Sequence, residues 1–426
     1  DLRGPVSKWL ASNGVSLEGF EFASSSDKGI GLTLTKNVTR SGWLIGVPRN
    51  LTLTQSKALK DPMVLTFWSV DPWVRNRSDV LLALHLIRER SKAIDSELAE
   101  FINALPDEFD TPLYWNISDL RKLNGTSAFA PALLSNSGPI FDYCRLHIAF
   151  PQPRDCEDKT LHSAAKRVLG IGLEDYMWST SIIQTRAAPD NGSFALVPIL
   201  DFVNAGEGSS QFALPTKAGF FLHVEAGAQV GDELVRQYQE KRSHDALVSQ
   251  GFVLENGTSF DEVVLELEML RDRFFHPRFQ SLASIDIMPV RGTPGGAAYY
   301  RGSLSRDGIP SEGLWASARV LSTKSLSTLK SMNTETLRQP FSMGQREINA
   351  ARWLLKQVRM ARKRLPKHDD GCKGSRPQCL VNRLATIEGA VLERAATWCR
   401  SFAKKLQEEQ EDAAETDQSD EQSDEL

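Results

Sequence analysis

The chain has 426 residues, 41% hydrophobic and 24% charged, which is enough apolar material for a buried core and a length typical of two or three domains. Its net charge of −4 and pI near 6.1 give no overall attraction for phosphate backbones or anionic membranes, so nucleic acid is not an expected partner. The longest nearly uninterrupted apolar run, residues 80–87, falls well short of the roughly 20 residues that a membrane span requires.

Residues 1–60 are expected to form short β-strands and turns. Their apolar stretches, at 31–34 and 44–48, are short and are interrupted by Gly, Ser and Asn. From residue 74 to 104 apolar residues recur every three or four positions, which predicts helices. A second strand-rich stretch follows over residues 196–252. The pattern predicts one strand-rich domain over residues 1–255, with a helical insertion at about 72–185.

Residues 256–407 are expected to form a second, all-helical domain, because long stretches at 261–275, 344–364 and 379–405 have helical patterning. One of these helices is basic and could attract an acidic segment of a partner, although such runs are usually solvated faces. Residues 408–426 are acidic and almost free of apolar side chains, so we expect a disordered tail. The fold class is therefore α+β.

Three separated segments carry the chemistry. The first is a Gly-X-Gly turn at residues 28–32. The second, residues 196–204, ends in Asn204 and is preceded by Thr185 and Arg186. The third covers residues 231–238, from Gly231 to Tyr238, and is followed by residues 242–244 and 251–253.

Taken in order, these segments resemble the SET-domain protein methyltransferases of the type that acts on the Rubisco large subunit or on actin. Parts of residues 82–126 are also similar to the insert of those enzymes, so the resemblance covers about 250 residues. It implies S-adenosylmethionine as the cofactor and Tyr238 as the catalytic residue, whose hydroxyl would orient a neutral amine toward the methyl group. The cofactor-binding residues that the resemblance implies are Lys28, Gly29, Ile30, Gly31, Arg186, Asp201, Asn204, Ala205, Gly251 and Phe252.

Two positions depart from the pattern of this family. Ala205 follows Asn204 where the family usually has His, which removes an imidazole from the cofactor pocket, and His244 stands in place of the usual Asn. The second domain resembles the substrate-binding domain of these enzymes only in position and helical character. The predicted activity is methylation of a protein Lys, with protein His as an alternative acceptor. A non-catalytic SET-fold binding protein is a further alternative, because of Ala205.

Several features favour the secretory pathway over the cytoplasm or a plastid. Seven of the 14 Asn residues begin an Asn-X-Ser/Thr glycosylation sequon, against roughly two expected by chance. They are Asn37, Asn50, Asn76, Asn116, Asn124, Asn191 and Asn256. Residues 423–426 are one letter from the Lys-Asp-Glu-Leu address, so we expect retrieval to the endoplasmic reticulum by its receptor. Because the chain begins at Asp1 rather than Met, we expect that N-terminal residues precede it.

The five cysteines are compatible with this compartment. Cys144 and Cys156 could close one local disulfide and Cys372 and Cys379 another, which would leave Cys399 over; five reduced thiols are the alternative. No Cys-X-X-Cys occurs and the seven His residues do not cluster with the cysteines, so the sequence predicts no zinc site.

Overall fold

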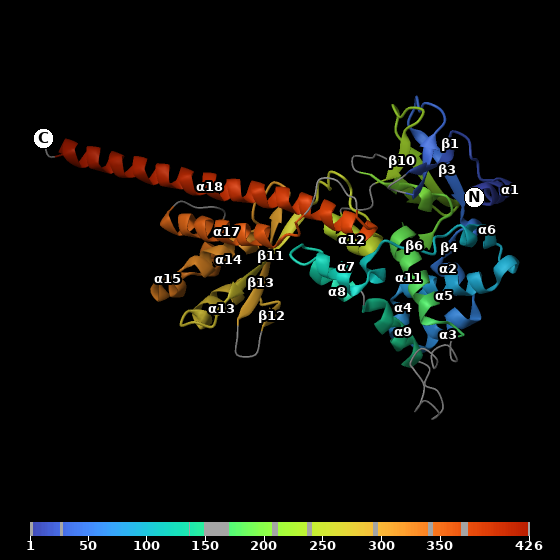
Figure 1. Cartoon of the computed structure of the whole chain (residues 1–426), viewed down its shortest axis with the longest axis horizontal. Helices are drawn as coiled ribbons and strands as arrows, with labels where there is room; N and C mark the ends of the chain where they lie inside the picture. The colour runs from blue at the N-terminus through green and yellow to red at the C-terminus, as the bar shows by residue number, and fades with distance from the viewer. Residues whose placement is uncertain are drawn as a thin grey trace. The chain divides into compact units, whose positions relative to one another are not determined.

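The structure, a computed structural model, divides into two compact units (Figure 1). It describes residues 3–25, 29–135, 137–148, 170–206, 212–236, 241–292, 297–339, 344–367 and 374–424. The N-terminal unit consists of Asp1–Tyr114, Ala132–Glu240 and Ala246–Phe252. The C-terminal unit consists of Trp115–Pro131, Lys241–Asp245 and Val253–Leu426. Three short segments that the sequence assigned to the first domain, residues 115–131, 241–245 and 253–255, therefore group with the second.

The strands that the structure describes in the N-terminal unit form three small sheets, with strand orders β1-β2-β10-β7, β3-β9-β8 and β4-β6-β5. The strands are β1 (Phe20–Ser25), β2 (Gly29–Leu34), β3 (Gly42–Pro48), β4 (Leu53–Thr54), β5 (Ala188–Asp190), β6 (Ser193–Leu196), β7 (Asn204–Ala205), β8 (Phe212–Pro215), β9 (Gly219–Val224) and β10 (Glu233–Arg236). Alternate residues of β3 and β9 are buried, as expected for strands with one face on a core. The expectation of purely β structure before residue 60 is wrong, because α1 (Arg3–Ser12) buries Val6 and Leu10 in this core.

The helices of the N-terminal unit surround α5, in which every residue from Val80 to Ile87 is buried. They are α2 (Gln55–Ala58), α3 (Pro62–Val70), α4 (Pro72–Arg75), α5 (Ser78–Ser91), α6 (Ala99–Asn103), α9 (Gly138–Ile148) and α11 (Leu173–Arg186), with the short 3-10 turns η1 (Arg49–Leu51), η2 (Ala93–Asp95) and η3 (Pro112–Tyr114). Asp61 and Asp71 cap α3 and α4, each followed by the Pro that suits a first helical position. Helix α8 (Phe129–Ser135) and helix α12 (Ser243–Gln250) each contribute residues to both units.

The C-terminal unit contains a three-stranded antiparallel sheet of order β11-β13-β12, so the prediction of an all-helical domain is wrong. Its strands are β11 (Glu262–Met269), β12 (Arg291–Gly292) and β13 (Ala298–Ser305). Residues 261–275 were expected to be helical, yet β11 alternates buried and more exposed residues along its length. That period of two is the signature of a strand, and it outweighs the spacing of Val and Leu that resembled a helix.

The helices of this unit pack around the sheet. They are α7 (Ile117–Lys122), α13 (Phe275–Ala283), α14 (Glu312–Ser322), α15 (Leu326–Ser331), α16 (Thr334–Arg338), α17 (Gln345–Arg364) and α18 (Arg376–Asp424). Glu388 of α18 is buried, and both of its carboxylate oxygens accept a hydrogen bond from the backbone N–H of Ser127, at 3.0 and 3.1 Å. Burial raises the pKa of Glu388 to about 8, against the opposing effect of these hydrogen bonds.

Residues 408–424 continue helix α18, so the predicted disordered tail is wrong for these residues. Ion pairs one turn apart, Lys404 with Glu408 and Lys405 with Glu409, join the start of the acidic segment to the packed part of the helix. Glu, Gln and Ala, which dominate the segment, are also strong helix formers. None of the helices in the described part of the chain combines the length and the hydropathy of a membrane span.

The described cysteines differ in state. Cys144 is a free thiol, so the predicted pairing with Cys156 is not formed, and Cys156 itself lies outside the described residues. Cys379 is disulfide-bonded, and the predicted partner, Cys372, also lies outside them. Cys399 is free and buried in the core of the C-terminal unit, where burial raises the pKa of its thiol to about 12. This thiol is a packing residue.

Candidate functional site

All three sequence segments meet in one sheet of the N-terminal unit. Strand β2 carries the Gly-X-Gly turn, β10 carries the segment after Gly231, and β7 begins at Asn204. Strand β10 lies between the other two: it pairs antiparallel with β2, where Leu234 lies opposite Leu32, and parallel with β7, where Val235 lies opposite Asn204. Segments far apart in the sequence are thus brought side by side by backbone pairing.

The centre of this arrangement is formed by Gly31, Asn204 and Glu233. The side-chain amide of Asn204 donates a hydrogen bond from Nδ2 to Oε1 of Glu233, at 2.8 Å. A Cβ atom placed on Gly31 would lie 2.7 Å from Nδ2 of Asn204 and 2.9 Å from Oε1 of Glu233. Both distances are well inside van der Waals contact, so a side chain at this position would displace Asn204, Glu233 or both. The glycine therefore lets the Asn204–Glu233 pair lie against the backbone of β2.

Asn204 retains hydrogen-bonding capacity for a ligand. An amide side chain has two N–H donors and a carbonyl oxygen with two lone pairs. The bond to Glu233 uses one donor, and Oδ1 of Asn204 makes no hydrogen bond to any residue in the described part of the chain. A half-buried amide of this kind can accept a hydrogen bond from an ammonium group and donate one to a carboxylate. It suits the charged amino acid end of a small molecule.

The chain reaches Asn204 through a strained turn. Ile199 is fully buried and has φ of 68° and ψ of −39°, in the left-handed region that β-branched residues rarely adopt. It immediately precedes the 3-10 turn η5 (Leu200–Phe202), whose residues are all buried. Strain of this kind costs of order 1–3 kcal/mol and persists only where the surrounding packing holds it. Here the strained turn sets the direction in which the chain enters β7.

Arg186 and Asp201 hold this turn together. Nη1 of Arg186, at the end of α11, donates to both the backbone oxygen and Oδ2 of Asp201, at 3.2 and 3.3 Å. Burial raises the pKa of Asp201, and the positive charges of Arg186 and Arg236 oppose that rise. Oδ1 of Asp201 is buried and has no hydrogen-bond partner among the described residues. The pair anchors η5 to α11 and leaves one carboxylate oxygen as an unused acceptor.

The other predicted residues are located as follows. Gly29 has φ of 77°, which favours glycine, and Ile30 is exposed beside it at the start of β2. Ala205 follows Asn204 in β7, opposite Arg236 of β10. Gly251 follows the end of α12 with φ of 76°, and a Cβ there would lie 2.8 Å from the backbone of Asp110 and Thr111, so Gly251 packs closely against that turn, and Phe252 follows it in the chain. Lys28 and the catalytic candidate Tyr238 lie outside the described residues.

Sequence reasoning missed Glu233 as a site residue. It was part of the quoted segment that begins at Gly231, but it was treated as a motif position rather than as a contact of Asn204. Its acidity, within a motif that also includes Gly231 and Tyr238, was the available signal. Arg236 was missed as well, because no spacing along the sequence indicates that its charge acts on Asp201.

The chain has the fold of solved SET-domain structures. Structures titled "Structure of Rubisco LSMT bound to AdoMet" and "Crystal structure of the SET domain of LSMT bound to Lysine and AdoHcy" match this chain with TM-scores of 0.68 and 0.67. Both are 18% identical in sequence, and both matches cover 95% of this chain and more than 90% of the other. At this level of identity the comparison defines the fold.

In sequence, the chain is similar to actin-histidine N-methyltransferases. It is 26% identical over 289 residues to the enzyme of Mus musculus and equally so to that of Homo sapiens. The match covers 66% of this chain and 47% of each relative, so the chain spans about half the length of the curated relatives that it matches. No protein-family model matches the chain.

Proposed function

We propose that this chain is an S-adenosylmethionine-dependent protein methyltransferase that acts on a lysine side chain. The observation that carries the proposal is the convergence of Gly31, Asn204 and Glu233 within a SET fold. The relatives supply the reaction class: the curated ones are named actin-histidine N-methyltransferases, and a structural neighbour is bound to AdoMet. Two independent comparisons therefore support the same chemistry.

The residues of the site fit the cofactor. The absence of a side chain at Gly31 lets the Asn204–Glu233 pair lie against the backbone of β2. Asn204 would bind the amino acid end of the cofactor through Oδ1 and its remaining N–H, while Glu233 holds the amide in place. The unpartnered Oδ1 of Asp201 is a further acceptor in the adjoining turn. When bound, S-adenosylmethionine supplies an electrophilic methyl group on a sulfonium.

The protein's own task is to deliver a neutral acceptor amine in line with that methyl group and to exclude water. We assign the orientation of the acceptor to Tyr238, whose hydroxyl can accept a hydrogen bond from the amine and so direct its lone pair. A lysine ammonium, with a pKa near 10.4, must lose a proton before transfer, whereas an imidazole, with a pKa near 6.5, is already mostly neutral at pH 7. The two acceptors therefore predict different pH dependences.

The test is incorporation of a labelled methyl group from the cofactor into candidate lumenal proteins, followed by mass spectrometry of the modified residue. With a lysine acceptor the single-turnover rate should rise with pH through at least about pH 9. With histidine it should level off above about pH 7.5. Absence of any incorporation from a preparation that binds the cofactor would remove the enzymatic proposal.

Ala205 motivates a second candidate function, a SET-fold binding protein without catalysis. Ala205 lies in β7, opposite Arg236 of β10, and its methyl side chain offers a cofactor no imidazole at a position where the family usually has one. In that case the chain would bind a protein partner without transferring a methyl group. The variant Ala205→His discriminates the two functions. A higher affinity of the variant for S-adenosylmethionine would favour the binding protein, because it would mean that Ala205 weakens the cofactor site. An unchanged affinity would favour the enzyme.

We further propose that the protein works in the lumen of the endoplasmic reticulum. The Asn side chains of all seven sequons are exposed, as the glycosylation machinery requires, and a disulfide-bonded Cys379 suits an oxidising compartment. A retrieval receptor that reads residues 423–426 would be the partner that retains it. Glycosidase-sensitive mass on the purified protein and secretion after deletion of these four residues are the expected results. An unglycosylated protein in the cytosol or a plastid would contradict the proposal.

A further inference from the structure

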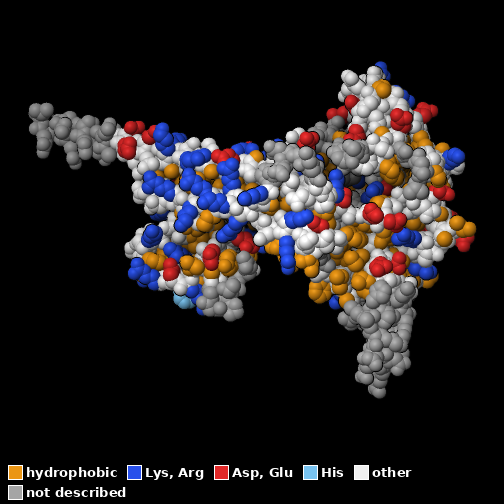
Figure 2. Space-filling view, in the orientation of Figure 1, with side chains coloured by type: hydrophobic (Ala, Val, Ile, Leu, Met, Phe, Trp, Pro, Cys, Tyr) orange, Lys and Arg blue, Asp and Glu red, His pale blue; other side chains and the backbone are white. Residues whose placement is uncertain are grey.

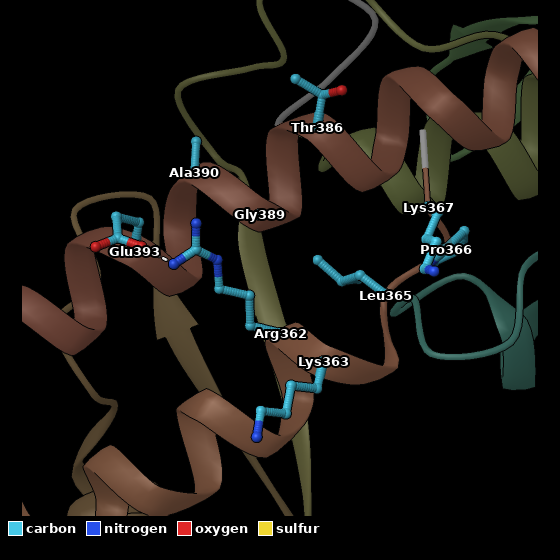
Figure 3. A pocket seen from close by; sticks show the side chains of 9 residues that line it. All are labelled: Arg362, Lys363, Leu365, Pro366, Lys367, Thr386, Gly389, Ala390 and Glu393. Carbon is cyan, nitrogen blue, oxygen red and sulfur yellow. Dashed lines mark hydrogen bonds and ion pairs between the residues drawn. The ribbon is translucent and has the colours of Figure 1, made fainter. Parts of the chain in front are cut away.

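An open groove of about 690 Å³ lies between the C-terminal end of α17 and the first half of α18, within the C-terminal unit (Figure 3). It is lined by Arg362, Lys363, Leu365, Pro366, Lys367, Thr386, Gly389, Ala390 and Glu393. We call it the basic groove. The α18 side presents the small residues Gly389 and Ala390, and a Cβ on Gly389 would meet only Leu365, at 3.7 Å. An open groove with small residues on one wall suits an extended peptide better than an enclosed small molecule.

The helix that borders the basic groove is strongly positive. Residues 348–367 contain seven Lys and Arg residues and no Asp or Glu. The spacing of Arg352, Lys356, Arg359 and Lys363 at intervals of four, three and four places these exposed side chains on one face of α17. Figure 2 shows Lys and Arg gathered on the face of the molecule over α17 and α18. The positive charge therefore forms a continuous stripe that leads into the groove.

Few of these charges are compensated. Glu393 forms ion pairs with Arg362 and, at 3.6 Å, with Arg400. The remaining cations within residues 348–367 make no ion pair with any residue that the structure describes: Arg352, Lys356, Arg359, Lys363, Arg364 and Lys367. Like charges one turn apart destabilise a helix by roughly 0.2–0.5 kcal/mol per pair. A solvated face that served only solubility would be expected to alternate acids with these bases.

We propose that the basic groove and its stripe bind an acidic segment of the protein substrate. The inference rests on the proposed function, since it names a feature of the protein that is methylated. From Arg352 to Lys363 the stripe is roughly 16 Å long at 1.5 Å per helical residue. This length matches about five residues of an extended chain. The segment recognised should therefore carry two or three carboxylates within five or six residues.

The protein has an acidic segment of its own, since residues 408–426 contain ten Asp and Glu and no Lys or Arg. It does not reach the groove of the same chain. Glu408 follows Ala390 by eighteen residues on one continuous helix, which separates them by roughly 27 Å along its axis. Only the acidic segment of a second copy of the chain could compete for the basic groove. That competition would be observed as self-association of the protein.

The test is a fluorescence-anisotropy titration of the full chain with a labelled twelve-residue Glu-Ser peptide and its Gln-Ser counterpart. The variant Arg359→Glu/Lys363→Glu reverses two charges of the stripe. The control Lys324→Glu/Lys330→Glu makes the same change of net charge at exposed positions at α15 in the same unit. We expect the stripe variant to bind the Glu-Ser peptide at least about tenfold more weakly and the control to change by less than about twofold. Equal losses in both variants, or none, would overturn the proposal.

Three further readouts separate the explanations. The titration needs no cofactor, so it can be read separately from cofactor binding. A chain that binds S-adenosylmethionine but not the Glu-Ser peptide would overturn only the proposed role of the basic groove. A chain that binds the peptide but not S-adenosylmethionine would overturn only the proposed methyltransferase activity. The Glu-Ser peptide should also inhibit labelled methyl incorporation into lumenal proteins, and incorporation that the peptide leaves unchanged would overturn a role in substrate binding. Self-association of the wild type in low salt, lost in the stripe variant during sedimentation, would overturn it in favour of the tail of a second copy.

Discussion

Replacement of Gly31 by Ala tests the geometry of the site with a single added methyl group. The backbone of Gly31 does not lie in the positive-φ region, so the substitution introduces no strain of its own. The added Cβ would lie 2.7 Å from Nδ2 of Asn204 and 2.9 Å from Oε1 of Glu233, where ordinary contacts begin at 3.4 Å. One or both side chains must therefore retreat by roughly 0.5–0.7 Å.

The retreat disturbs the 2.8 Å hydrogen bond that holds the Asn204 amide. A hydrogen bond to a charged group contributes about 1.5–3 kcal/mol, and part of it would be lost together with the alignment of the amide. We expect the affinity for S-adenosylmethionine to fall by about 1–3 kcal/mol, that is about 5- to 150-fold. The fold should persist, because the displaced atoms are the ends of side chains rather than backbone.

The assay is calorimetric titration of S-adenosylmethionine into the wild type, Gly31→Ala and the control Gly42→Ala. Gly42 begins β3 of the same unit, and a Cβ there meets nothing within 4 Å. The control should bind as the wild type does, and melting temperatures should differ by no more than a few degrees among the three proteins. Wild-type affinity in Gly31→Ala would refute the position of the cofactor beside Asn204.

Three other substitutions test separate parts of the molecule. Asn204→Ala should weaken cofactor binding by about 1–3 kcal/mol in the same titration, and an unchanged dissociation constant would mean that the cofactor binds elsewhere. Tyr238→Phe should slow methyl transfer while cofactor affinity changes by less than about 1 kcal/mol; a wild-type rate in this variant would exclude catalysis by the hydroxyl. Glu388→Gln should change how stability depends on pH. The pKa of Glu388 rises from 4.5 in the unfolded chain to about 8 in the folded one. Its stabilising contribution to the free energy of unfolding is therefore complete below pH 4.5 and is lost as pH rises through about 8. Between these values the free energy of unfolding of the wild type should fall relative to Glu388→Gln, by at most about 1.4 kcal/mol per pH unit, and parallel urea-unfolding midpoints across pH 5.5–7.5 would contradict the assignment.

The SET fold could be predicted from the sequence because its information lies in short motifs, whereas the site residues stay a prediction. The Gly-X-Gly turn, the Asn that ends an apolar segment and the motif that begins at Gly231 are visible one by one along the chain. Their meeting depends on sheet pairing between β2, β10 and β7, which local patterns do not reveal. The pairing of Asn204 with Glu233, and the effect of Arg236 on Asp201, are consequences of that register.

The errors lie where local patterns conflict or end. In β11 the alternation of Val263, Leu265 and Leu267 with more exposed residues was masked by apolar neighbours that also suit a helix. For residues 408–424, composition predicted disorder because the segment has almost no apolar surface to bury. The segment nevertheless extends a long, packed helix, so it forms without a separate helix-nucleation step. Buried Glu388 was not anticipated, since its partner Ser127 is far away in the sequence.

Calorimetric titration of the wild-type chain with S-adenosylmethionine tests the central claim most directly, because it requires neither the protein substrate nor the compartment to be known. The site built from Gly31, Asn204 and Glu233 predicts one binding site per chain with a dissociation constant in the range of about 1 μM to 1 mM. No binding at several millimolar cofactor, from a preparation that unfolds cooperatively, would contradict it.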